Sequence, residues 1–214
     1  MEPQISTEFR ASPRSFDRTH NLELTGTWEL PFGKGKQWVS KGGVAAAILG
    51  GWRLNSMASF MTGTPFSVTA SGSSLNMPGN TQRADLVKSN VQILGGVGSG
   101  ASFFDPLAFA PVTQARFGTA GYNLLRGPGI VNWDSGLFRD FLLKERFKLQ
   151  FRAESFNFSN TPHFANPGAN VSNMVLNPDG TVKNLAGFSQ ILSTIVTGRT
   201  IDERQFRFGL KVIF

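Results

Sequence analysis

The sequence contains no cysteine, and its two histidines, His20 and His163, are far apart in the chain. Without thiols, the chain has neither a disulfide framework nor a zinc site built from cysteine. Two isolated histidines do not have the spacing of a metal site, so we expect no bound metal and no cofactor. Because no nucleophile is paired with a base in the sequence, we also expect no catalytic residues and no enzyme activity.

Charge is scarce as well: charged residues make up 16% of the chain, against about 25% in average soluble domains. The net charge is +7, but the 21 lysines and arginines are scattered, so we expect no nucleic-acid partner. The longest apolar run, Val44–Trp52, is far shorter than the roughly 20 residues of a transmembrane helix. Residues Met1–Ser15 contain no apolar segment of the secretory type, so we expect no signal peptide in this chain.

Glycine (24 residues) and phenylalanine (20 residues) are abundant, and apolar and polar residues alternate in several stretches. Alternation with a period of two is typical of β-strands that have two different faces. The pattern predicts five strands, at His20–Leu30, within Val44–Val68, near Asn132–Phe141, at Arg146–Phe156 and at Arg204–Phe214. The sequence therefore predicts an all-β, antiparallel fold.

The predicted connections between these strands are short, long, short and long. The short ones are turns at Pro31–Lys36 and Leu142–Glu145, and the long ones are loops over residues 70–130 and 159–198, rich in Gly, Ser, Asn and Pro. Barrels of the bacterial outer membrane have short periplasmic turns and long extracellular loops. We therefore expect both turns on the periplasmic side and both loops outside the cell.

The alternation alone fits two architectures, because a soluble sandwich and a membrane barrel both have one apolar and one polar face. The loop lengths, the apolar residue at the end of the last strand and four tryptophans near predicted strand ends favour the barrel. This predicted aromatic belt consists of Trp28, Trp38, Trp52 and Trp133. Arg139 interrupts the apolar face, and we expect its guanidinium to reach the periplasmic headgroup region.

The polar face of the barrel is predicted to line a wet or plugged lumen. Its predicted residues are Arg53, Asn55, Gln150, Arg152, Glu154, Arg207 and Lys211. We expect the carboxylates of this face to pair with arginine or lysine across strands rather than to bind a ligand. His163, in the second long loop, is expected to be solvated. Five strands cannot close a membrane barrel, so we expect them to belong to a larger wall.

Seven pieces of the chain, in this order, resemble the C-terminal end of a TonB-dependent outer-membrane receptor. They are "FDRTHNLELTGTWELPFGKGK", "GGWRLNSMASFMTGTPFSV", "RADLV", "FFDPLAFAP", "FGTAGYNLLRGPGIVNWDSGLFRDF", "KLQFRAESFNFSNTPHFANP" and "RQFRFGLKVIF". Within these receptors the chain is most similar to the Oar-like group, whose members carry an N-terminal carboxypeptidase-regulatory-like domain.

The resemblance implies that residues 1–214 are about five C-terminal strands of a 22-stranded barrel in the outer membrane of a Gram-negative bacterium. Such a receptor imports a bulky ligand, such as a siderophore or a glycan, with energy delivered through TonB. The implied partners are outer-membrane lipid, the remainder of the barrel with its plug, and TonB through an N-terminal part. Since that part is not in this sequence, we expect this piece alone not to transport.

The ending also looks like the signal that outer-membrane proteins present to the barrel-assembly machinery. The residues of this predicted signal are Phe206, Phe208, Gly209, Leu210, Val212 and Phe214. An extended terminal segment would add its backbone to a receptor edge, and its alternate side chains would give specificity. The alternative is a soluble or surface-attached β-sandwich that binds carbohydrate or a protein partner, in which this stretch is an ordinary last strand.

Overall fold

The computed structural model describes residues 13–144, 147–195 and 202–214. The chain forms two compact units. The sheet unit consists of His20–Thr62, Ile130–His163 and Ile195–Phe214, and the loop unit of Met1–Thr19, Gly63–Gly129 and Phe164–Thr194.

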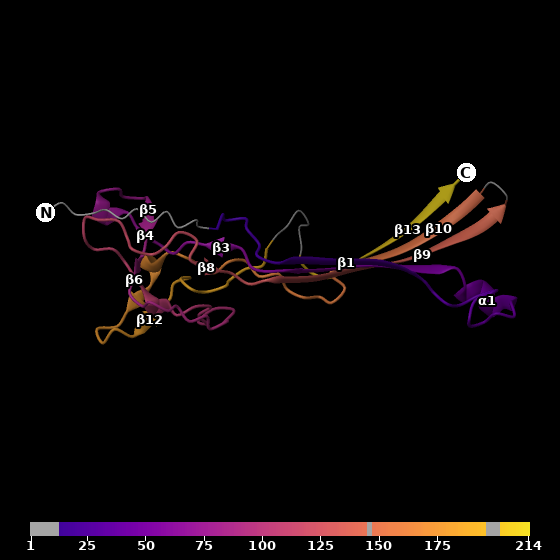
Figure 1. The fold of residues 1–214 in the computed structure, drawn as a ribbon, viewed down its shortest axis with the longest axis horizontal. Helices are drawn as coiled ribbons and strands as arrows, with labels where there is room; N and C mark the ends of the chain where they lie inside the picture. The colour runs from indigo at the N-terminus through magenta and orange to yellow at the C-terminus, as the bar shows by residue number, and fades with distance from the viewer. Residues whose placement is uncertain (1–12, 145–146, 196–201) are drawn as a thin grey trace. The chain divides into compact units, whose positions relative to one another are not determined.

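The sheet unit is built on five antiparallel strands that lie side by side (Figure 1). They are β1 (Asn21–Glu29), β2 (Trp52–Met61), β9 (Ile130–Lys144), β10 (Phe147–Phe156) and β13 (Gln205–Ile213), hydrogen-bonded in the order β1-β2-β9-β10-β13. The five predicted strands are thus confirmed. The predicted turn at Leu142–Glu145 is wrong for Leu142–Lys144, which continue β9, whereas Glu145 lies outside the described residues.

The connection between β1 and β2 differs from the predicted six-residue turn. It contains a helix, α1 (Gly43–Leu49), at the end of the sheet where β1 stops and β2 begins (Figure 1). Ile48, which has the same parity as Trp52, is therefore helical and not part of a strand. The physical reason is local: the stretch "VAAAIL" has good helix formers, and Gly42 and Gly43 start it with positive φ.

The strand register places alternate residues on two distinct faces. One row across the sheet joins Trp28, Leu54, Leu137, Ala153 and Phe208. The neighbouring row, on the other face, joins Thr27, Asn55, Gly136, Glu154 and Arg207. The first is apolar and the second largely polar, so the predicted alternation of faces is confirmed.

The two long connections of the sheet form the loop unit, which has a core of its own. Phe104 is fully buried at its centre, with ring centroids 6.0 Å from Phe66, 5.7 Å from Phe109 and 5.4 Å from Phe188. The two long connections are thus loops, as expected, but they share a packed core that the sequence pattern did not predict. Their extracellular position stays a prediction.

Short elements frame this core. Among the described residues, the strands pair into two-stranded ribbons: β3 (Pro65–Phe66) with β8 (Leu125–Arg126), β4 (Thr69–Ser71) with β5 (Thr81–Arg83), β6 (Asp85–Leu86) with β7 (Phe109–Ala110) and β11 (Val175–Leu176) with β12 (Val182–Asn184). The 3₁₀ turns of this part are η1 (Ser73–Leu75), η2 (Pro106–Ala108) and η3 (Val171–Asn173). In the part of the chain that the structure describes, no helix has the length and apolar character needed to cross a membrane.

Candidate functional site

The apolar face of the sheet carries large exposed side chains on β1, β2, β9 and β13. Exposed residues of this face include Leu22, Leu24, Trp28, Phe60, Val131, Trp133, Phe206, Phe208, Leu210 and Val212. Phe208, in the last strand, is 74% exposed. Contiguous apolar surface of this kind is rare on proteins that live in water and marks a surface that meets lipid or another protein.

The opposite face carries a hydrogen-bonded polar network across three strands. Arg53 Nη2 donates to Asp140 Oδ2 at 2.7 Å, and Gln150 Nε2 donates to Asp140 Oδ1 at 2.8 Å. Arg152 Nε in turn donates to Gln150 Oε1 at 2.7 Å. The expected pairing of a carboxylate with arginine across strands is thus observed for Asp140 and Arg53.

The other predicted lumen residues share this face but are bonded differently. Lys211 lies opposite Gln150, and Arg207 lies opposite Glu154. The guanidinium of Arg207 lies 4.8 Å from the ring centroid of Phe156. All seven predicted residues therefore lie on one face, while their contact with a lumen stays a prediction.

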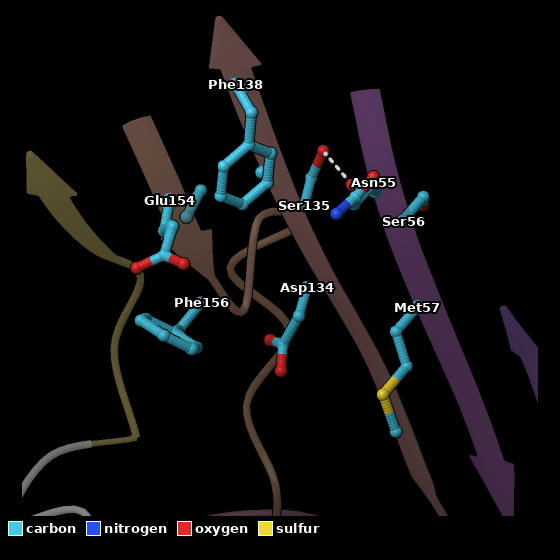
Figure 2. A pocket seen from close by; sticks show the side chains of 10 residues that line it. Asn55, Ser56, Met57, Asp134, Ser135, Phe138, Glu154 and Phe156 are labelled. Carbon is cyan, nitrogen blue, oxygen red and sulfur yellow. Dashed lines mark hydrogen bonds between the residues drawn. The ribbon is translucent and has the colours of Figure 1, made fainter. Parts of the chain in front are cut away.

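A shallow hollow lies on this polar face, and its labelled lining comes from β2, β9 and β10 (Figure 2). The carboxylates of Asp134 and Glu154 and the rings of Phe138 and Phe156 surround it. Gly136 makes the arrangement possible, because a Cβ there would lie 2.6 Å from Phe138 Cε2. The phenylalanine ring therefore lies back over the glycine along its own strand. The sequence pattern did not reveal this contact.

The four predicted belt tryptophans are distributed between the two ends of the sheet. Trp28 and Trp52 lie where β1 ends and β2 begins, and Trp38 lies in the adjoining connection, 5.2 Å from the ring of Phe32. Trp133 lies toward the other end, and its Nε1 donates to Ser56 Oγ at 2.6 Å. Tryptophans at both ends suit girdles at both membrane interfaces.

Arg139 is on the apolar face, as predicted, but its surroundings differ from the expectation. Its guanidinium donates to the carbonyl oxygens of Ala47 and Ile48 at the end of α1. It also lies 5.4 Å from the ring centroid of Trp52 and 4.4 Å from that of Phe141. With 9% of the residue exposed, Arg139 is bound by the helix terminus rather than extended toward headgroups. The sequence signal for this partner was the alanine-rich stretch between two glycine pairs.

His163 is not solvated, and that expectation is wrong. Its Nδ1 lies 2.7 Å from Asp202 Oδ1, its backbone N–H donates to Asp202 Oδ2 at 2.6 Å, and its Nε2 lies 3.1 Å from the carbonyl oxygen of Val131. The His163 side chain is only 13% exposed. Among residues 13–144, 147–195 and 202–214, no group of three His, Asp or Glu side chains is arranged to hold a metal ion.

The predicted assembly signal coincides with β13. Phe206, Phe208, Leu210 and Val212 point to the apolar face, and Gly209 lies opposite Arg152 on the polar face. Phe214 follows the strand and is 92% exposed. The strand is thus formed as expected, and its recognition by the assembly machinery stays a prediction.

A five-stranded antiparallel sheet with one exposed apolar face and one charged face has the features of a membrane β-barrel wall. The chain matches the model of the family described as "Outer membrane beta barrel domain" over residues 2–206. It belongs to this family, whose members are placed in the outer membrane, and the soluble-sandwich alternative is wrong. No curated protein and no solved structure matches the chain.

Proposed function

We propose that this chain forms wall strands of a TonB-dependent receptor that imports a bulky ligand across the outer membrane of a Gram-negative bacterium. The observation that carries the proposal is the register of the sheet. It puts the exposed aromatic and aliphatic side chains on one face and the network of Arg53, Asp140 and Gln150 on the other, as a wall between lipid and a wet lumen requires. The seven pieces that resemble these receptors support the more specific assignment.

The edges of the sheet support a barrel much larger than five strands. Strands β1 and β13 each pair with one neighbour in the described structure. In hydrocarbon, each unpaired backbone group costs several kcal/mol, so both edges need further strands. A large barrel also leaves room for a plug and a bulky ligand such as a siderophore or a glycan, which a small, side-chain-filled barrel excludes.

The loop unit supports a receptor rather than a simple pore. Its two segments, Gly63–Gly129 and Phe164–Thr194, share the core around Phe104. Both segments leave the sheet at the same end, after β2 and after β10, while β9 and β10 are joined closely at the other end. Pre-ordered loops at one mouth of a barrel are suited to selecting a large ligand.

The test is cross-linking in living cells that express the native gene product at its normal level. A photoreactive residue in the outer-membrane-binding region of TonB should yield an adduct with this protein, and a protonophore should change the yield. A porin in the same membrane serves as the matched control, because it does not use TonB. Absence of the adduct, with an equally strong adduct to a known TonB-dependent receptor of that cell, would overturn the proposal.

A further inference from the structure

The connection between β1 and β2, residues 30–51, has an unusual composition. It contains three lysines, Lys34, Lys36 and Lys41, and no aspartate or glutamate. Lys36 Nζ is paired with Glu29 Oε2 of β1 at 2.9 Å. Lys34 and Lys41 are exposed, and their ammonium groups have no hydrogen bond or ion pair to the residues that the structure describes. The connection therefore presents positive charge without any neutralising carboxylate of its own.

The same connection exposes apolar side chains that water does not favour. Val44 is 76% exposed and Ile48 is 60% exposed, and Leu49 and Trp38 are exposed too. Helix α1 contains no polar side chain, and Ala46 is its buried residue. A short apolar helix flanked by lysines and a tryptophan has the composition of segments that lie in a membrane interface.

The structure attaches this helix to the apolar side of the sheet. Trp52, Arg139, Phe151 and Leu210 form one row across the apolar face. From this row, Trp52 Nε1 donates to the carbonyl oxygen of Ile48 at 3.0 Å, and Arg139 donates to the carbonyl oxygens of Ala47 and Ile48. The exposed side chains of α1 therefore continue the surface that faces lipid in the proposed wall.

Two glycines fold the connection tightly enough to hold this arrangement. Gly33, with φ of +115°, approaches Gly50 so closely that a Cβ on Gly33 would lie 2.9 Å from Gly50 Cα. A Cβ on Gly50 would lie 2.6 Å from the carbonyl oxygen of Ala46. The helix end, the lysines and Trp38 are thereby kept in one compact segment rather than in an extended loop.

We propose that residues 30–51 are a membrane-surface anchor that inserts α1 into the interfacial layer and binds anionic phospholipid headgroups through Lys34 and Lys41. The charge of the segment complements phosphate, and its apolar helix is continuous with the lipid-facing side of the wall. The inference rests on the proposed orientation of that wall. It adds a lipid-binding site that the transport function does not require.

The absence of cysteine allows a direct test with single nitroxide labels. The native gene product carrying Val44→Cys, Ile48→Cys or Leu49→Cys is labelled and reconstituted in vesicles of phosphatidylethanolamine and phosphatidylglycerol. Labels at Phe208→Cys and Lys211→Cys are the controls for the lipid and polar faces. Collision with oxygen and with a water-soluble nickel chelate is then measured by electron paramagnetic resonance. We expect the three helix labels to resemble the label at 208, with several-fold more oxygen than nickel contact.

The headgroup contact is tested with the same labels. Replacing phosphatidylglycerol by phosphatidylcholine should raise the nickel contact of the helix labels several-fold, and so should the K34Q/K41Q variant. K183Q removes an exposed lysine of the loop unit and should leave it unchanged. If the label at 208 is in lipid but the helix labels are in water, the proposed anchor is wrong, while the proposed orientation of the wall is supported. If the label at 208 is also in water, the wall orientation and the anchor both fail. If the nickel contact of the helix labels stays low in phosphatidylcholine and in K34Q/K41Q, the proposed headgroup site is wrong.

Discussion

The carboxylate of Asp202 binds His163 from two sides. Oδ2 accepts the backbone N–H of His163 at 2.6 Å, and Oδ1 lies 2.7 Å from the ring Nδ1. The other ring nitrogen, Nε2, lies 3.1 Å from the carbonyl oxygen of Val131 in β9. Asp202 precedes β13 and His163 follows β10. The imidazole therefore connects a residue of β9 with the segments next to β10 and β13.

Removal of this carboxylate should destabilise the sheet. Because His163 and Asp202 are both largely buried, D202A leaves a backbone N–H and a ring nitrogen without their acceptor, which costs about 1.5–3 kcal/mol. The free energy of unfolding in detergent, followed by tryptophan fluorescence during urea titration, measures the loss. E203A, at the exposed neighbouring residue, is the matched control. Equal stability of the two variants would show that the contact carries no stabilisation.

The contact between Gly136 and Phe138 predicts a coupled pair of substitutions. In G136A the new Cβ would lie 2.6 Å from Phe138 Cε2, so the ring must move, at a cost of about 1–3 kcal/mol. In a F138L background the same glycine substitution should cost far less, because the ring is gone. A double-mutant cycle of unfolding free energies measures the coupling. If the losses of unfolding free energy in G136A and F138L simply add in the double variant, the position of the Phe138 ring does not depend on the glycine.

The Arg139 side chain should control the order of α1. R139A removes the donors to the carbonyl oxygens of Ala47 and Ile48, and hydrogen bonds with a charged partner are worth about 1.5–3 kcal/mol each. The population of molecules in which α1 is locally unfolded should therefore rise roughly tenfold or more. The rate of tryptic cleavage after Lys41 measures this population. R152A, which removes an arginine of the polar face, should leave this rate unchanged. A wild-type rate in R139A would contradict the contact.

Sequence reasoning succeeded where a single period describes the structure. Residues 205–212 alternate between the two faces, and the strand and its faces followed from that pattern. It failed at Ile48, because helix and strand patterns coincide over a few residues beside Trp52. It also failed for the loop unit, since Phe104 and Phe188 are brought together from distant segments whose strands have only two or three residues. The His163–Asp202 pair was missed because no local spacing connects its members.

The loop unit should respond to acid through Asp85. Arg116 donates to both carboxylate oxygens, at 2.7 and 2.8 Å, and this pair lowers the pKa of Asp85 below its ordinary value. The resulting stabilisation is present above the ordinary aspartate pKa of about 3.9 and is lost as the pH falls through the lowered value. Near pH 4.5, D85N should be cut by pepsin within the Phe103–Phe109 segment several-fold faster than wild type. The difference between the two rates should shrink as the pH is lowered further, because the carboxyl of Asp85 then becomes protonated in the wild type.

A second aspartate supplies the control for this pH dependence. The pKa of Asp179 is also lowered, by hydrogen bonds from Thr181, but that contact lies within one exposed turn. D179N should therefore leave cleavage in the Phe103–Phe109 segment unchanged over the same pH range. If D179N and D85N were cleaved at the same rate, the loss of one negative charge, and not the loss of the Asp85–Arg116 pair, would explain the faster cleavage.

Loss of Phe214 should impair assembly without weakening the folded sheet. The residue follows β13 and is 92% exposed, so its side chain contributes little to packing once the protein is folded. Recognition by strand addition depends on alternate side chains of the extended segment.

Deletion of Phe214 and F214A should therefore lower the amount of protein inserted in the outer membrane several-fold, measured by membrane fractionation. F214Y keeps the aromatic ring and should insert normally. The unfolding free energy of purified F214A should equal that of wild type, and a matching loss of stability would assign the defect to folding instead of recognition.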